Sequence, residues 1–464
     1  MEAIALKAAM LMCALLLQKP HSRTSNRDLV SCLQRRLSLW IQGDVDALLD
    51  EGRTIQQRLV SHSGFQSRLD DDHHISWRFV EHMLHGNVKT ALNLLNTSEH
   101  SGVPLSLDKP VSPGDPSWLV IDELKKKHPI GQPAPSEVLL PPPTRDSICH
   151  PIVFDVLDGA AIRSAALRTK GAAGPSGLDA YGWRRLCTSF RGASNDLCDS
   201  LASVARRLCT SYVDPVDITA LVAGRLIALD KCPGVRPIGV GEVIRRIICK
   251  AVLSVLKFDI LEAAGSLQLC AGQDAGNEAA VHAMREVFGD SLTEAVLLVD
   301  ASNAFNNLNR QATLHNMQSL CPSLATILIN TYRRDTPLFI DNCCLFSSEG
   351  TTQGDPLAMA MYSIGVTPLI NTLQDPQICQ VWFADDATAG GSLKGLYDWW
   401  CALKSKGSSY GYFVNASKTC LIVKPEHFDW LRKSFRILVL ALLLRVSIIW
   451  GLYWFLVIYY RVCE

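Results

Sequence analysis

The chain has 464 residues, with 45 basic and 45 acidic side chains and 48% hydrophobic residues. These values exclude a disordered tail, a collagen-like fibre and a polytopic membrane protein. The net charge of zero argues against a protein that coats nucleic acid by bulk charge alone, but it leaves local patches open. The 16 cysteines are scattered without a C-x-x-C pair, which favours free thiols over a disulfide framework.

Residues 1–100 predict a helical N-terminal region without evident chemistry. Leu29, Leu33 and Leu37 recur at helical spacing, and a second periodic run follows a Gly-Asp break. Residues 1–17 are apolar, but an early acidic residue and the lack of a small-residue cleavage pattern favour an ordinary helix over a signal peptide.

Residues 101–145 predict a Pro-rich linker. Prolines punctuate it at Pro133, Pro135 and 141–143, and a basic run occupies 125–127. Beyond residue 150 the hydrophobic pattern becomes mixed, with both helical and strand-like periods.

Local charge is uneven beyond the linker. Residues 161–260 carry 15 Lys and Arg against 8 Asp and Glu, a balance of 15 − 8 = +7. Residues 291–390 carry 3 against 9, a balance of 3 − 9 = −6. A basic block suits phosphate groups and an acidic block suits divalent metals, although solvated faces would give the same counts.

Carboxylates follow two apolar runs in the acidic block. Residues 295–299 predict a buried strand, and Asp300 comes directly after it. A second apolar run ends in Asp385 and Asp386. If the two strands lie side by side, these carboxylates come close together and repel each other unless a divalent metal lies between them. Two metals held in this way drive phosphoryl displacement in polymerases and nucleases.

The string Gly-x-x-Gln-Gly-Asp-Pro at 350–356 lies between the two runs, and Pro356 suits the first turn of a following helix. This string is rare. Together with Asp300-x4-Phe305, Phe-Ala-Asp-Asp at 383–386 and further strings in order, it resembles the reverse transcriptases of non-LTR and related retroelements. The further strings are Gly-Pro-Ser-Gly at 174–177, Arg-Pro-Ile at 236–238 and Gly-Tyr-Phe-Val-Asn-Ala-Ser-Lys at 411–418.

The resemblance covers about 150–425 and implies an α+β right-hand polymerase with an antiparallel palm sheet backed by helices, preceded by the helical region. The fingers-like part would span 146–290 and the palm 291–428. The implied reaction is template-directed transfer of a nucleotide from dNTP to a primer 3′-OH. The implied partners are an RNA template, a DNA primer and dNTP.

Roles follow for the matching residues. Asp300, Asp385 and Asp386 would be catalytic and would bind two Mg²⁺ ions, with Mn²⁺ as an alternative. Lys418 would supply a proton or charge near the pyrophosphate leaving group. Asn415 is expected to shape its turn.

The remaining residues would bind the nucleotide. Phe305 matches the family's steric gate, whose ring occupies the space that a ribose 2′-OH needs. Lys231 and Arg236 would hold the triphosphate, since a guanidinium fork fits phosphate oxygens. The backbone at Ala301 would skirt the triphosphate. Two further residues would line the nucleotide and template pocket: Gln353 and Gly354.

The sequence departs from the family at Phe383, where Tyr is common, and beyond Lys424, where a thumb is expected. There a hydrophobic tail spans 432–464, so processive synthesis is expected to be impaired. Residues 437–460 are apolar enough for a transmembrane helix, with more positive charge before the stretch than after it. A genuine tail would mean a single-pass membrane location, and a gene-model artefact would mean a cytoplasmic or nuclear one. Two alternatives stay open: an inactive relic that binds nucleic acid, and a protein dominated by its membrane anchor.

Overall fold

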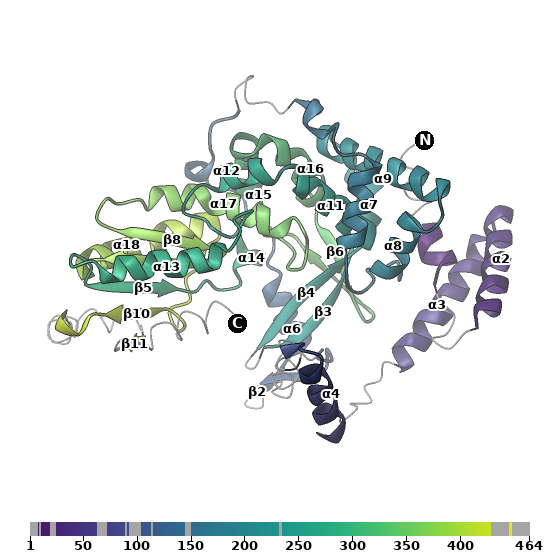
Figure 1. Cartoon of the computed structure of the whole chain (residues 1–464), viewed down its shortest axis with the longest axis horizontal. Helices are drawn as coiled ribbons and strands as arrows, with labels where there is room; N and C mark the ends of the chain where they lie inside the picture. Colours follow the sequence, from purple (N-terminus) through teal and green to yellow (C-terminus); the bar gives the residue numbers. More distant parts are fainter. Residues whose placement is uncertain are drawn as a thin grey trace.

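The computed structural model describes residues 8, 11–18, 25–62, 72–88, 91, 104–112, 115–143, 150–231, 234–427 and 445–447. Helices alternate with mainly antiparallel strands in this part of the chain, which gives a mixed α/β fold. Figure 1 shows α2 and α3 at one end of the molecule and the sheet that contains β5, β8 and β10 at the other.

The N-terminal helices are α2 (Asn26–Gln42), α3 (Val45–His62) and α4 (Asp72–Leu84). The Ser25 side chain caps α2 by accepting a hydrogen bond from the Asp28 amide, and Gly43 ends the helix with φ of 77°. Arg36 is buried and donates to Glu51, which joins α2 to α3. These helices lie in the range that the sequence predicted to be helical.

A five-stranded sheet has the order β11-β10-β5-β9-β8 and is antiparallel except between β10 and β11. Its central strand coincides with the strand predicted over 295–299. Successive residues of that strand face opposite layers: Val296 packs toward α13, and Leu297 packs in the core that includes α17 and α18. The strands are β5 (Ala295–Val299), β8 (Cys379–Phe383), β9 (Asp386–Gly391), β10 (Cys420–Val423) and β11 (Arg445–Ser447), and the covering helices are α13 (Gly276–Gly289), α17 (Ala358–Thr372) and α18 (Leu393–Gly407).

A four-stranded sheet has the order β4-β3-β6-β7. Burial alternates along β3 and β4, so one face of this sheet is covered and the other is more open. Leu226, Val235 and Leu338 pack on the covered face against Val120 and Leu124 of a short helix. The strands are β3 (Gly224–Asp230), β4 (Val235–Gly241), β6 (Thr336–Ile340) and β7 (Cys343–Ser347), and the helix is α6 (Val120–Lys127).

A helical layer forms the largest core of the molecule. Its centre includes Trp183, Ile247 and Leu328, each with almost no exposed surface. The helices are α7 (Gly159–Arg168), α8 (Ala180–Thr188), α9 (Gly192–Thr210), α10 (Pro215–Val222), α11 (Val243–Val255), α12 (Lys257–Ala264), α15 (Arg310–Leu320) and α16 (Pro322–Tyr332). The short helix α14 (Ala304–Asn307) packs instead in the core of the five-stranded sheet.

The described residues between 104 and 143, in the range predicted as a linker, are anchored along both sheets. They include the hairpin of β1 (Pro110–Ser112) and β2 (Asp115–Leu119), which leads into α6. The Leu105 amide donates to the carbonyl of Ala228 in β3 over 2.8 Å. The Leu140 amide donates to Oδ1 of Asn316 in α15 over 2.8 Å.

The membrane location predicted from the tail is wrong for the part of the chain that can be described. No helix among the described residues is both long and apolar enough to cross a bilayer. Most of the stretch 437–460 lies outside those residues, and its described part, Arg445–Ser447, is strand β11, paired with β10. The prediction rested on apolar composition, which a membrane helix shares with a strand of a sheet.

Candidate active site

Asp300 lies directly after the central strand β5 and is fixed through its backbone and its side chain. The Asn415 amide donates to the Asp300 carbonyl over 2.7 Å, and Asn415 Nδ2 donates to Asp300 Oδ2 over 3.0 Å. Lys418 Nζ lies 3.9 Å from the same carboxylate oxygen. Asn415 was predicted only to shape its turn, so its contact with the carboxylate is a feature that sequence reasoning missed.

Asp385 occupies the tight turn between β8 and β9. Phe383 pairs with Asp386 across this turn, and Ala384 has φ of 55°, a conformation that is rare for alanine. The Gln268 side chain holds the strained residue from both sides: Nε2 donates to the Ala384 carbonyl over 3.0 Å, and Oε1 accepts from the Ala384 amide over 2.9 Å. Strain that is held in place in this way is a recurring feature of functional sites.

Strand register brings the carboxylates together. Val299 of β5 pairs with Ala387 of β9, so the next residue along each strand puts Asp300 opposite Asp386. The sequence predicted that the two carboxylate strands lie side by side, but β9 lies between β5 and β8. The carboxylates therefore meet through the turn that joins β8 to β9.

The charges of the site act on one another. Burial raises the pKa of Asp385, and the nearby charge of Asp300 raises it further, while Lys231 and Lys418 oppose the shift. A cation bound between Asp300 and Asp385 would therefore stabilise the ionised form of both carboxylates.

The donor set fits a divalent metal that is shared with a substrate. Among the described residues, no group of three or more His, Cys, Asp or Glu side chains is arranged to hold a metal. Mg²⁺ differs from many ions in that it usually takes one or two carboxylates and completes its shell with water and substrate phosphates. Asp300 and the Asp385 turn supply oxygen ligands of that kind.

A buried arginine, Arg310, holds the start of the Gln353 loop, which spans residues 347–354. Arg310 Nε donates to the Gly350 carbonyl over 2.8 Å, and its terminal nitrogens donate to the carbonyls of Ser347 and Glu349 over 2.7 and 2.8 Å. The Glu349 carboxylate in turn accepts from the Gln132 amide. Because Arg310 is almost fully buried, these bonds fix the start of the loop.

The same loop contacts β4 of the other sheet. The Gly239 amide donates to the Gln353 carbonyl over 2.7 Å. Gly354 has φ of 104°, and a Cβ there would lie 2.5 Å from the Gly239 carbonyl oxygen, so the close approach requires glycine. Behind it, Asp355 forms a buried ion pair with Arg245. These contacts bring the loop beside the strand that carries Arg236.

Phe305 is half-buried in α14. Its ring stacks on Tyr362 of α17, with centroids 4.6 Å apart and planes at 28°. Its carbonyl accepts from the Thr351 amide over 2.6 Å, which ties the residue to the Gln353 loop. Ala301 is buried and bridges to Val414. Both residues therefore have fixed positions in the segment that follows Asp300.

Lysines and an arginine from distant segments act electrostatically on one another near Asp300, which contacts Lys418. Burial lowers the pKa of Lys231, and the charges of Lys418 and Arg236 lower it further, while Asp300 opposes the shift. Lys127 lies within reach of the same charges. Lys127 was not among the predicted site residues, because a basic run in a Pro-rich segment carries no signal of what it contacts.

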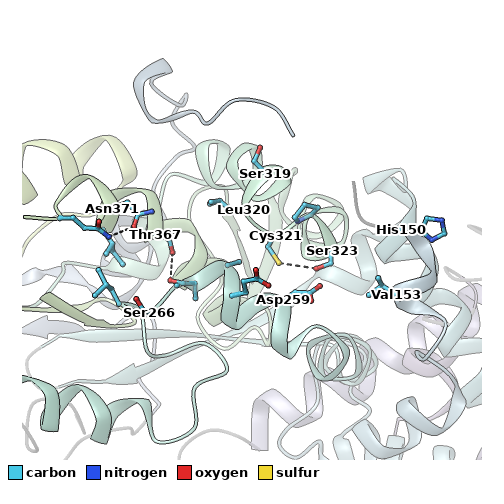
Figure 2. A pocket seen from close by; sticks show the side chains of 18 residues that line it. His150, Val153, Asp259, Ser266, Ser319, Leu320, Cys321, Ser323, Thr367 and Asn371 are labelled. Carbon is cyan, nitrogen blue, oxygen red and sulfur yellow. Dashed lines mark hydrogen bonds between the residues drawn. The ribbon is translucent and has the colours of Figure 1, made fainter. Parts of the chain in front are cut away.

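A further pocket has a volume of about 760 Å³, and Figure 2 shows side chains that line it. Its lining comes from α12, the junction of α15 and α16, and α17, with Asp259, Ser323 and Asn371 among the side chains. The lining includes none of the residues predicted for catalysis or nucleotide binding.

Comparison with known proteins supports a reverse transcriptase assignment for part of the chain. Residues 230–432, less than half of the chain, match the family model described as reverse transcriptase (RNA-dependent DNA polymerase). All of the predicted site residues lie within this range. The match supports reverse transcriptase and nucleotidyltransferase function in general. The comparison with curated proteins gave no match.

Solved structures of telomerase from Candida tropicalis resemble the chain weakly. A complex with a fragment of telomeric RNA has a TM-score of 0.35 at 14% identity, over 43% of this chain and 41% of that one. The apo enzyme gives 0.35 at 15%, over 44% and 45%, and a form truncated from its C-terminal domain gives 0.33 at 14%, over 43% and 50%. The chain thus spans half or less of the length of these proteins, and the resemblance adds no argument about function.

Proposed function

We propose that the chain is an RNA-directed DNA polymerase of a non-LTR or related retroelement. In this proposal β3 and β4 belong to the fingers and the five-stranded sheet is the palm. The observation that carries the proposal is the meeting of Asp300 with the Asp385 turn, beside cations from the other sheet and within a range that matches the reverse transcriptase family.

The proposed reaction joins the primer 3′-oxygen to the α-phosphorus of a dNTP and releases pyrophosphate. Two Mg²⁺ ions, or Mn²⁺ in their place, would lower the barrier by stabilising the negative charge that develops on the phosphate oxygens. Asp300, Asp385 and Asp386 would hold these ions, and their repulsion without a cation supports that role. Lys418, beside Asp300, would stabilise the leaving pyrophosphate.

The nucleotide would be held by residues from both sheets. Arg236 and Lys231 would bind the triphosphate from the β3–β4 side. Phe305 would act as the steric gate against a 2′-OH, and its stacking on Tyr362 would keep the ring from moving aside. Gln353 and Gly354 would border the base and the template.

Primer extension tests this function directly. The purified full chain should extend a DNA primer on an RNA template when Mg²⁺ is present. Asp385→Asn should reduce the rate at least about 10³-fold, because an amide is a much poorer metal ligand than a carboxylate. Asp398→Asn, an exposed position on α18, is the matched control and should keep the wild-type rate.

Other outcomes separate the alternatives. Extension that survives Asp385→Asn would exclude the proposed mechanism. Salt-dependent RNA binding without metal-dependent extension by the wild type would instead support an inactive relic that binds nucleic acid.

A further inference from the structure

Lys127 is the last residue of α6, outside the range that matches the reverse transcriptase family. Its carbonyl accepts hydrogen bonds from Asn303 Nδ2 over 2.9 Å and from Asn306 Nδ2 over 2.8 Å. Both asparagines follow Asp300 closely, and Asn306 is in the same short helix as Phe305. The end of α6 is therefore fixed to the segment that connects the catalytic carboxylate to the proposed steric gate.

The chain that follows Lys127 is also held to the site. The Gln132 amide donates to Glu349 Oε2 over 2.6 Å, just before the Gln353 loop. The Ala134 amide donates to Gln311 Oε1 over 2.9 Å. Hydrogen bonds at the Lys127 carbonyl and in the segment after it therefore fix the Lys127 backbone beside the site.

The environment of Lys127 is unusual for a lysine. Its side chain is 22% exposed and lies 3.8 Å from Glu123, one turn earlier in α6. Burial lowers its pKa, Glu123 opposes that shift, and the charges of Lys418 and Arg236 lower the pKa further. Lys127 is in turn one of the cations that lower the pKa of Lys231.

Four cations from separate segments thus lie within electrostatic reach of one another, and two of them, Lys231 and Lys418, also interact with Asp300. The four are Lys127, Lys231, Arg236 and Lys418. Glu123 beside Lys127 and Asp300 beside Lys418 offset part of the repulsion among these cations, and further negative charge bound between them would be favourable. A polyphosphate is the anion that offers several charges in a small volume.

We propose that Lys127 is an additional nucleotide-binding residue, which contacts the phosphates of the incoming dNTP and is held by Glu123 until the nucleotide arrives. The proposal rests on the polymerase function proposed above. It assigns a role at the active site to a segment outside the family match.

The neighbouring lysines supply matched controls, because they belong to the same basic run but have different surroundings. Lys125 is 60% exposed and lies 3.9 Å from Asp122. Lys126 lies over the ring of Trp118, 5.8 Å from its centroid. Neither lysine is among the charges that act on Lys231. A general effect of basic charge should therefore appear when any of the three lysines is replaced, whereas an effect on nucleotide binding should appear only when Lys127 is replaced.

Steady-state kinetics of the full chain on an RNA template with a DNA primer test the proposal. Lys127→Gln should raise KM for dNTP roughly 10- to 100-fold, the range for a lost charge-assisted contact, with kcat nearly unchanged. Lys125→Gln should keep the wild-type KM, and Lys127→Arg should recover part of the loss. Affinity for the template–primer duplex, measured by fluorescence anisotropy, should not change.

A wild-type KM for Lys127→Gln would overturn the proposal. So would a parallel loss of duplex affinity, since that would make Lys127 a contact to the nucleic-acid backbone. If the wild type incorporates no nucleotide, the proposed function fails, and calorimetric binding of tripolyphosphate with Ca²⁺ then decides the role of Lys127 separately. Binding that Lys127→Gln weakens and Lys125→Gln does not would support the role, and equal binding by all three proteins would reject it.

Discussion

The two large sheets contribute opposite charges to the same place. The five-stranded sheet supplies carboxylates where β5 ends and β8 turns into β9, above a core of aliphatic and aromatic side chains. The four-stranded sheet supplies Lys231 and Arg236 around the connection of β3 to β4. Burial is the main cause of the raised pKa of Asp385 and of the lowered pKa of Lys231, and the like charges beside each residue add to its shift.

The Gln353 loop (residues 347–354) connects the acidic five-stranded sheet to the basic four-stranded sheet, and hydrogen bonds fix it on both sides. Arg310 of α15 holds the start of the loop, and the Gly239 amide of β4 donates to the Gln353 carbonyl near its end. The loop therefore sets the distance between the acidic and the basic half of the site. Loss of this link should therefore disturb the site more than loss of a single charge from either half.

Removal of the buried Arg310 should have the largest effect. Arg310→Met leaves the carbonyls of Ser347, Glu349 and Gly350 buried without a donor, so we expect a loss of roughly 3 kcal/mol or more of unfolding free energy. Urea denaturation measures this change, with the exposed Arg334→Met as control. A loss as small as that of the control would mean that the loop does not depend on Arg310.

Removal of a cation from the basic half should weaken nucleotide binding. Arg236→Gln should raise KM for dNTP by roughly 10- to 100-fold, because a guanidinium–phosphate contact contributes about 1.5–3 kcal/mol. Arg225→Gln, at an exposed position on β3, is the control for general charge. An equal rise in both variants would show that the basic sheet attracts nucleotide only through its overall field.

Truncation of the stacked aromatic ring should relax the choice of sugar. Phe305→Ala should reduce the preference for dNTP over the matching NTP by about 10- to 200-fold, the range for steric discrimination of a small group. Competition between dNTP and NTP in primer extension measures this preference. Phe346→Ala, an exposed residue of β7, should leave it unchanged. Unchanged selectivity in Phe305→Ala would reject the steric-gate role.

Neutralisation of one carboxylate should have the smallest effect, and it should stabilise the fold. The folded pKa of Asp385 is raised, so its ionised form costs stability above that pKa, and the cost disappears as pH falls below the unfolded value. Asp385→Asn in EDTA at pH 8 should therefore be more stable than the wild type, and the gain should shrink in acid.

Thermal melting with and without Mg²⁺ checks this prediction. Added Mg²⁺ should stabilise the wild type more than Asp385→Asn, because only a protein that binds the ion gains stability from it. A variant that is less stable than the wild type in EDTA would show that the Asp385 carboxylate stabilises the fold by itself.

Part of this arrangement could be predicted from the sequence, because its signals are local. The apolar run at 295–299 and its terminal carboxylate identify a strand end, and the rare string around Gln353 identifies a loop. The order of the strands has no such signal, so the position of β9 between β5 and β8 was missed. Lys127 was missed for the same reason, since its partners Asn303 and Asn306 lie about 176 to 179 residues away.

The hydrogen bonds between the segment after α6 and the candidate site also have a consequence for the order of folding. The Gln132 amide and the Glu349 carboxylate are 217 residues apart in the chain. At a synthesis rate of about 5–20 residues per second, α6 leaves the ribosome roughly 10 to 40 s before this partner exists. The hydrogen bonds of the segment around α6 therefore cannot form until the chain up to Glu349 has been synthesised. Contacts between residues so far apart in the sequence are typical of slow steps in folding.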